Sequence, residues 1–260
     1  MADPVPDRLR VLVTNDDGVA SPGLLALASA VATLGHEVLV VAPLADRSGV
    51  GSALGWSSGQ SVRTERLTVP ELPGIPFHGV AGTPALAVTL ARTGVFGRPP
   101  WCVVAGINHG ANTGRSVLHS GTVCAALTAA TQGMSGLAVS VDARQPVHLA
   151  SAARVAAEAA RWLVAARKRT VLNVNVPDLP FEQLRGVRWG RLAAYGRARW
   201  TSSPVDGGDP MLALAVSDIP PDPGTDEGLV AAGYVSVTPL SGLQALADET
   251  AVTALGQALG

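Results

Sequence analysis

Two adjacent aspartates near the start of the chain are the residues whose type and spacing point most clearly to chemistry. Asp16 and Asp17 stand in Asn15-Asp16-Asp17-Gly18, directly after the β-branched run Arg10–Thr14. Neighbouring carboxylates repel each other by about 4 kcal/mol at close range with an effective dielectric of about 20, and they also repel a phosphate group. A hard divalent cation reverses this, because Mg²⁺ binds one or two carboxylates together with water and phosphate oxygens. The pair therefore predicts a metal site. Capping of the next helix is the alternative, but Ser21 already suits that position.

A second loop contains amide side chains that could complete such a site. Asn108 and Asn112 lie in Gly106–Gly114 (GINHGANTG), which follows the apolar run Trp101–Ala105. Amide groups bind a metal ion or a phosphate oxygen without adding negative charge, and the glycines allow close backbone approach. A plain turn is the alternative for this loop. His109, within it, could assist the leaving group.

Two further segments offer groups for the same site. Ser120-Gly121-Thr122 begins a predicted helix, whose first N–H groups form an anion site. Ser48, in Pro43–Gly51, could add a neutral oxygen ligand, although position alone favours an ordinary loop serine. Thr83 precedes Pro84 at another helix start, where we expect capping first and substrate contact second. Together, these segments predict a pocket in which a metal ion bridges the protein and a phosphate group. They are the acidic turn at Asp16 and Asp17, the loop with Asn108 and Asn112, and the helix start at Ser120.

The elements around these segments alternate as a parallel sheet covered by helices on both faces requires. Ser21-Pro22 supplies an N-cap and a first-turn proline, and apolar residues then follow at helical spacing up to Gly35. Ligands bind outside the carboxyl ends of strands in such a sheet, where the acidic turn stands. The predicted strands are Arg10–Thr14, Glu37–Ala42, Trp101–Ala105, Leu137–Val141 and Val171–Val176, and the later helices cover Ser120–Gln132 and roughly 149–167.

The pattern changes after residue 180. Segments rich in Pro and Gly at 204–210 and 220–228 alternate with strand-like runs at 211–216 and 233–237. We expect one domain over residues 1–260. Its Rossmann-like core would span 9–180, and a β-rich lobe with a C-terminal oligomerisation arm would span 181–260.

Composition excludes several classes of protein. Of the 260 residues, 47% are hydrophobic and 15% are charged, which is enough apolar surface for a large core. A net charge of −1 offers no field for a nucleic-acid duplex or an anionic membrane. No apolar stretch reaches the ~18 residues of a membrane span, and residues 1–8 lack a signal-peptide core. Cys102 and Cys124 read as reduced core residues. A cytoplasmic location is expected.

Seven motifs, in this order, resemble the SurE family of survival-protein nucleotidases. They run from about residue 10 to 240: VTNDDGVASPG, GHEVLVVAPLADRSG, AGTP, AGINHGANTG, HSGTV, NVNVP and GTDEGLVAAGYVSVTPL. The resemblance implies a Rossmann-like α/β core whose C-terminal elements are exchanged between subunits of a homodimer or homotetramer. It also implies hydrolysis of nucleoside 5′- and 3′-monophosphates, dependent on one Mg²⁺ or Mn²⁺ per subunit.

Motif position carries roles over to individual residues. The implied metal ligands are Asp16, Asp17, Ser48 and Asn108. The implied phosphate-binding residues are Asn15, Asn112, Ser120, Gly121 and Thr122, and Asp16, Asn112 and Ser120 are expected to act in catalysis. The chain departs from the usual family pattern at Ala105, at His119, near Thr128 and at Gly49–Gly51, none of which is an implied ligand.

Alternatives stay open for both the function and the mechanism. The substrate could be another small phosphate ester or polyphosphate, or the pocket could bind metal and nucleotide without turnover. Gly35-His36-Glu37-Val38 also resembles the first domain of nucleotide-sugar glycosyltransferases, although 260 residues leave no room for their second domain. The attacking group could be water or an aspartate. No P-loop or H-E-x-x-H motif occurs.

Overall fold

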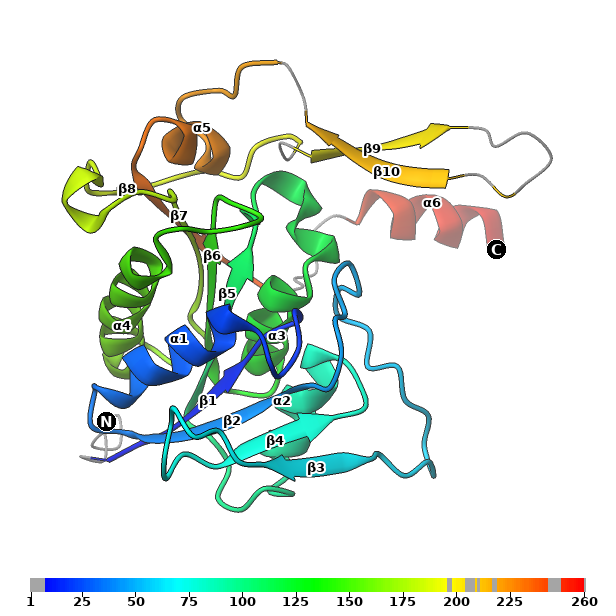
Figure 1. Cartoon of the computed structure of the whole chain (residues 1–260). Helices are drawn as coiled ribbons and strands as arrows, with labels where there is room; N and C mark the ends of the chain where they lie inside the picture. The colour runs from blue at the N-terminus through cyan, green and yellow to red at the C-terminus, as the bar shows by residue number, and fades with distance from the viewer. Residues whose placement is uncertain are drawn as a thin grey trace.

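A nine-stranded sheet forms the centre of the molecule (Figure 1). The computed structural model describes residues 8–195, 198–203, 209, 211–216, 219–242 and 249–259. The strand order in the sheet is β3-β4-β2-β1-β5-β6-β7-β11-β8, and β9 and β10 pair separately. Only β3 with β4 and β11 with β7 pair antiparallel in the large sheet. The predicted mostly parallel α/β fold is therefore confirmed.

In the first two thirds of the chain the elements follow one another closely, except across residues 44–63 between β2 and β3. The strands are β1 Arg10–Thr14, β2 Glu37–Pro43, β3 Thr64–Leu67, β4 Phe77–Val80, β5 Cys102–His109, β6 Ser135–Val141, β7 Val171–Val176, β8 Val187–Trp189, β9 Ala198–Ser203, β10 Met211–Val216 and β11 Val235–Leu240. The helices are α1 Pro22–Ala32, α2 Pro84–Arg92, α3 Gly121–Thr131, α4 Leu149–Ala165, α5 Asp226–Ala231 and α6 Thr250–Leu259, with 3₁₀ turns η1 Gly114–His119 and η2 Phe181–Gln183.

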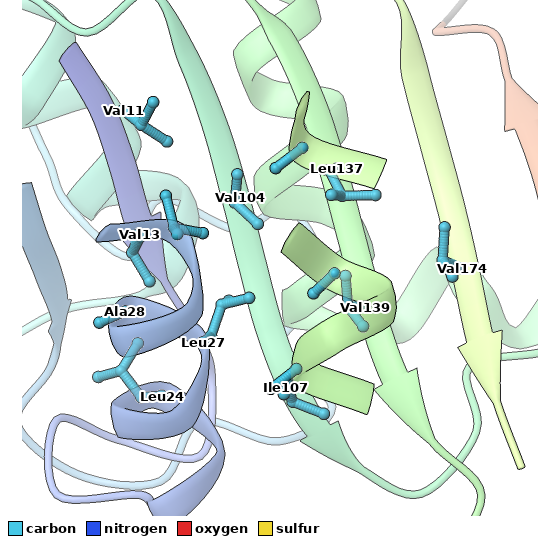
Figure 2. Close-up of a cluster of buried hydrophobic side chains, with 14 of the residues drawn as sticks. Val11, Val13, Leu24, Leu27, Ala28, Val104, Ile107, Leu137, Val139 and Val174 are labelled. Carbon is cyan, nitrogen blue, oxygen red and sulfur yellow. The ribbon is translucent and has the colours of Figure 1, made fainter. Parts of the chain in front are cut away.

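Helices cover both faces of the sheet. α1 packs beside α4 on one face, and α2 packs beside α3 on the other. Figure 2 shows Leu24, Leu27 and Ala28 of α1 in one buried cluster with side chains of the neighbouring strands, and Leu27 points toward Val104 of β5. Burying each such leucine is worth about 2 kcal/mol. The first face therefore holds α1, and with it the acidic turn before α1, firmly against the sheet.

The position of β1 in the sheet explains where the site forms. β1 lies between β2 and β5, so the chain leaves β1 toward one edge and later continues from β5 toward the other. Such a switch point opens a crevice at the carboxyl ends of the two strands. The two crossovers β5–α3–β6 and β6–α4–β7 both advance in the same direction across the sheet. Because α3 and α4 lie on opposite faces of the sheet, these two crossovers have opposite handedness.

β5 is longer than the sequence indicates. The prediction ended the strand at Ala105, but pairing with β6 resumes at Asn108 and His109 after a register irregularity. Gly106 permits this irregularity, because its φ is +130° and a Cβ at this position would lie 2.2 Å from the Val139 carbonyl oxygen. The glycine that indicated a loop in the sequence is thus a kink within a strand.

Two other local predictions need correction. Ser21 occupies the N-cap of α1, but its hydroxyl makes no capping bond and is buried without a hydrogen-bond partner. α4 ends at Ala165, slightly before the predicted end near residue 167. Thr83 and Ser120, in contrast, cap α2 and α3 as predicted.

The residues after 180 contribute to the same sheet. β11 pairs with β7 and β8, while β9 and β10 form a two-stranded arm that extends beyond it (Figure 1). The Pro/Gly run 204–210 lies almost wholly outside the described residues. The separation of a lobe at residue 181 and its exchange between subunits stay predictions. Among the described residues, no helix has the length and apolarity to cross a membrane.

Candidate active site

The acidic turn after β1 is fixed by its own backbone and by the segment after β2. Asn15 is fully buried, and its Nδ2 donates to the Gly18 carbonyl at 3.0 Å. Gly18 has φ +100°, and a Cβ there would lie 3.3 Å from the backbone of Ala45. The Arg47 N–H donates to the Asp16 carbonyl at 2.7 Å. Asn15 therefore shapes the turn, and its predicted contact with phosphate stays a prediction.

Asp16 is held at the start of α3. Thr122 Oγ1 donates to Asp16 Oδ1 at 2.5 Å, and the N–H groups of Gly121 and Thr122 also donate to this carboxylate. A Cβ at Gly121 would lie 2.7 Å from Asp16 Oδ2, so only glycine permits the approach. Burial raises the pKa of Asp16, and these three donors oppose the rise.

This arrangement corrects one expectation. Gly121 and Thr122 were predicted to offer free N–H groups to a phosphate, but in the structure these groups bind the carboxylate of Asp16. The anion bound at the N-terminus of α3 is thus the Asp16 carboxylate of the protein itself. Ser120 accepts a hydrogen bond from the Val123 N–H at 3.1 Å, which leaves its own hydroxyl hydrogen to donate. Whether Ser120, Gly121 and Thr122 contact phosphate stays a prediction.

Asp17 sits in an environment that disfavours a bare carboxylate. Burial, together with the charges of Asp16 and Asp46, raises the pKa of Asp17 to about 7. The backbone N–H of His109 donates to this carboxylate and partly opposes the rise. One oxygen, Oδ2, is buried without a hydrogen-bond partner. A bound cation would relieve both the repulsion and the missing contact.

Asp46 is a nearby carboxylate that the sequence reasoning missed. Ser48 Oγ donates to Asp46 Oδ1 at 2.7 Å, and the Ser48 N–H donates to the same oxygen at 2.8 Å. The hydroxyl oxygen of Ser48 remains able to accept or to bind a cation. The signal was present in the sequence: Asp46 stands two residues before Ser48, in a loop at the same sheet edge as Asp17.

Asn108 lies one strand away from the acidic turn. It pairs with Ser140 of β6, which pairs in turn with Asn175 of β7, so three polar residues stand side by side across three parallel strands. Asn108 Nδ2 donates to the Gly110 carbonyl at 2.7 Å. This bond fixes the amide plane and leaves Oδ1 as the atom available to a ligand.

Asn112 is clamped by two asparagines that the sequence reasoning also missed. Its N–H donates to Asn175 Oδ1 at 2.8 Å, and its carbonyl accepts from Asn173 Nδ2 at 2.8 Å and Asn175 Nδ2 at 2.9 Å. Its own Nδ2 donates to Ser140 Oγ at 2.9 Å. Asn173 and Asn175 alternate with valines in a fully buried strand, and such buried amides require partners. The alternation of asparagine and valine in the sequence could therefore have indicated that these two amides bind a neighbouring segment.

His109 lies against the start of α1, and its role in assisting a leaving group stays a prediction. Its Nε2 is buried without a hydrogen-bond partner and lies 3.3 Å from the position that a Cβ on Gly23 would take. Burial lowers the pKa of this imidazole. Helix α1 therefore lies against one edge of the ring.

The candidate ligands are a mixture of oxygen types. No group of three or more His, Cys, Asp or Glu side chains suited to a metal occurs within the residues that the structure describes. Asp16, Asp17 and Ser48 follow the carboxyl ends of β1 and β2, and Asn108 ends the neighbouring β5. Carboxylate, hydroxyl and amide oxygens suit Mg²⁺ or Mn²⁺ better than Zn²⁺.

Comparison with known proteins gives consistent matches. Residues 11–201 match the family model described as survival protein SurE. A 5′-nucleotidase SurE from Pseudomonas putida is 42% identical over 241 residues, covering 89% of this chain and 92% of the relative. One from Alkalilimnicola ehrlichii is 40% identical over 265 residues, covering 97% and 95%. The crystal structure of a SurE protein from Aquifex aeolicus superposes with a TM-score of 0.78 at 31% identity, covering 95% of this chain and 99% of that one.

Proposed function

The chain belongs to the survival protein SurE family, and from that membership we propose that Asp16 and Asp17 bind a divalent cation in the hydrolysis of nucleoside monophosphates. The protein is a phosphomonoesterase of the 5′-nucleotidase class, the name carried by relatives that are 40% and 42% identical to it. The observation that supports the cation is the unpartnered buried oxygen of Asp17, next to a second carboxylate.

The residues present fit a hard cation. Asp17 Oδ2 is buried without a hydrogen-bond partner, and its carboxylate lies close enough to Asp16 and Asp46 to be disfavoured by their charges. Ser48 and Asn108 each keep an oxygen for coordination. When bound, a divalent cation supplies positive charge that offsets the charge on the phosphate group. We propose Mg²⁺ or Mn²⁺, one per subunit.

Three side chains are suited to act on the phosphate group. Ser120 keeps a hydroxyl hydrogen, and Asn112 keeps a second amide hydrogen on Nδ2, so both can donate to equatorial oxygens. Asp16 holds the acidic turn against α3 and orients the oxygens around it. Because three donors already bind the Asp16 carboxylate, it is a poor nucleophile. This favours water as the attacking group, in line with the leaving oxygen.

Phosphate release tests this proposal. Wild-type protein should hydrolyse adenosine 5′-monophosphate with Mg²⁺ or Mn²⁺, stop on addition of EDTA and recover when the cation is restored. Asp16→Asn should abolish turnover while circular dichroism and thermal unfolding show a folded protein. Asp222→Asn is the matched control, because this exposed aspartate pairs with Arg191 far along the chain. Substantial turnover by folded Asp16→Asn protein would contradict the proposed role of Asp16 in the reaction.

Finer points of function belong to the same proposal. We expect activity on 3′-monophosphates as well, and a panel with sugar phosphates and polyphosphate measures the preference directly. Binding of cation without turnover of any substrate in the panel would favour a non-catalytic binder. We place the enzyme in the cytoplasm.

We also propose a homodimer or homotetramer. Val252 and Leu255 of α6 are 69% and 61% exposed in the single chain, which leaves apolar surface for a partner subunit. Light scattering after size exclusion gives the mass in solution. A monomer at micromolar concentration would contradict this part.

A further inference from the structure

The loop of residues 51–60 is tied to the candidate site at two points. The Gly51 N–H donates to the His119 carbonyl at 3.1 Å, and His119 directly precedes Ser120 at the start of α3. Thr83 Oγ1 donates to the Ala53 carbonyl at 2.6 Å, at the start of α2. The same loop continues from Ser48, the candidate ligand. These bonds hold its first half beside the place where a phosphate group would bind.

Trp56 presents a flat apolar ring from this loop. The residue is 41% exposed, as is Leu54 two positions earlier. Its indole Nε1 donates to the Gln60 carbonyl at 2.6 Å, and the Ser57 N–H donates to Gln60 Oε1 at 3.3 Å. The polar edge of the ring is thus satisfied within the loop, which fixes the ring while leaving apolar surface exposed.

The surroundings of Trp56 favour a neutral aromatic ligand. No charged residue occurs from Ser48 to Val62. Within the part of the chain that the structure describes, no aromatic or cationic group stacks on the indole. A nucleobase has a π-face whatever its identity, so an exposed indole in a loop that is bonded to the residue before Ser120 suits the base of a nucleotide.

We propose that Trp56 is the stacking platform for the nucleobase and determines the preference for nucleotides over phosphate esters that lack a base. The inference rests on the proposed function, because the phosphate group must first be held near Ser120. Among the side chains that the structure describes, Trp162 of α4 and Trp189 of β8 are also exposed, but neither lies in a loop that follows β2.

Two substrates separate base binding from phosphate chemistry. Adenosine 5′-monophosphate and ribose 5-phosphate share the phosphate and the sugar but differ in the base. Trp56→Ala should lower kcat/KM for the nucleotide about 10-fold, mainly through KM, and leave kcat/KM for ribose 5-phosphate unchanged. Trp56→Phe should restore most of the loss, because it keeps an aromatic ring. Trp162→Ala, which removes a tryptophan that is 58% exposed on α4, is the control.

Several results would overturn the inference. Equal losses on both substrates would show a structural role for Trp56, and no loss on either would remove the residue from the site. If wild-type protein hydrolyses neither substrate, the proposed function itself fails, and the inference with it.

Discussion

Asp17 is the side chain whose ionisation links the chemistry of the site to the stability of the fold. Burial and the carboxylates of Asp16 and Asp46 raise its pKa to about 7, whereas in the unfolded chain it ionises near 3.8. Below pH 3.8 both states are protonated, and the stabilisation is fully present. As pH rises toward 7, the unfolded chain loses its proton first, and the native state loses stability.

We therefore predict that cation-free protein becomes less stable between about pH 4 and pH 7. The contribution of Asp17 should be roughly 1–2 kcal/mol, since water screens a side chain that is only partly buried. Asp17→Asn should flatten this part of the profile and raise Tm at pH 8. Thermal unfolding in EDTA measures both. Adding Mg²⁺ at pH 8 should stabilise the wild type more than the variant; identical profiles for the two proteins would contradict this account.

Thr122 provides a second test at the level of one side chain. Its hydroxyl donates to Asp16 Oδ1 at 2.5 Å, and hydrogen bonds to charged groups are worth about 1.5–3 kcal/mol. Thr122→Val keeps the shape of the residue and removes this donor, so kcat/KM should fall roughly 10- to 100-fold. Thr128→Val is the matched control, because that hydroxyl donates to the Cys124 carbonyl within the same helix. Steady-state kinetics with both variants decides; equal effects would show that the bond to Asp16 is unimportant.

At the scale of elements, the segment between β5 and α3 depends on β7 for its position. Asn175 holds Asn112 through two bonds, one to its N–H and one to its carbonyl. Asn173 adds a third. The segment that carries Asn112 is thus attached to a buried strand two places away from β5 in the sheet.

Asn175→Ala should release this attachment. Both backbone groups of Asn112 lose a partner, so we expect roughly 1–3 kcal/mol of lost stability and a larger proportional fall in kcat than in cation affinity. The control is Ser236→Ala, which removes the residue paired with Asn175 on β11, whose buried hydroxyl has no hydrogen-bond partner. Thermal unfolding and kinetics on both variants test it. A catalytic defect as large in Ser236→Ala would refute the specific role of Asn175.

Sequence patterns predicted these elements correctly where the hydrophobic periodicity and the capping residues indicate the same boundaries. They failed where contacts between distant residues determine the local structure. Thr83 and Ser120 were recognisable caps because their bonds are local. The continuation of β5 past Gly106 could not be read, since a glycine inside a strand resembles a glycine in a loop. Nor could the partners of the α3 start be read: Thr122 and Asp16 lie 106 residues apart. The spacing of residues near a helix N-terminus does not indicate which anion its free N–H groups bind.

At the scale of the molecule, the sheet order brings four distant segments to one crevice. β1 and β2 deliver the acidic turn and the Ser48 segment, while β5 and α3 deliver the amides and Thr122. The last third of the chain takes part too. β11 lies between β7 and β8, so residues beyond 230 complete the sheet that carries Asn173 and Asn175.

Asp226 makes this long-range dependence testable. It is fully buried at the start of α5, and its carboxylate accepts from the N–H groups of Gly114 at 2.9 Å, Ala193 at 3.0 Å and Glu227 at 2.9 Å. Gly114 begins η1, which leads to Ser120. One carboxylate therefore joins the C-terminal third of the chain to the backbone that leads into α3.

Asp226→Ala should leave these N–H groups unpaired and cost roughly 2–4 kcal/mol of stability. Because η1 loses its attachment, kcat should fall even under conditions where the variant is fully folded. Asp226→Asn keeps one acceptor oxygen and should lie between the wild type and the alanine variant in both properties. Asp222→Asn, four residues earlier and exposed, should change neither. Chemical denaturation and kinetics at 15 °C give the comparison, and an alanine variant with reduced stability but unchanged kcat would show that Asp226 supports the fold without positioning the site.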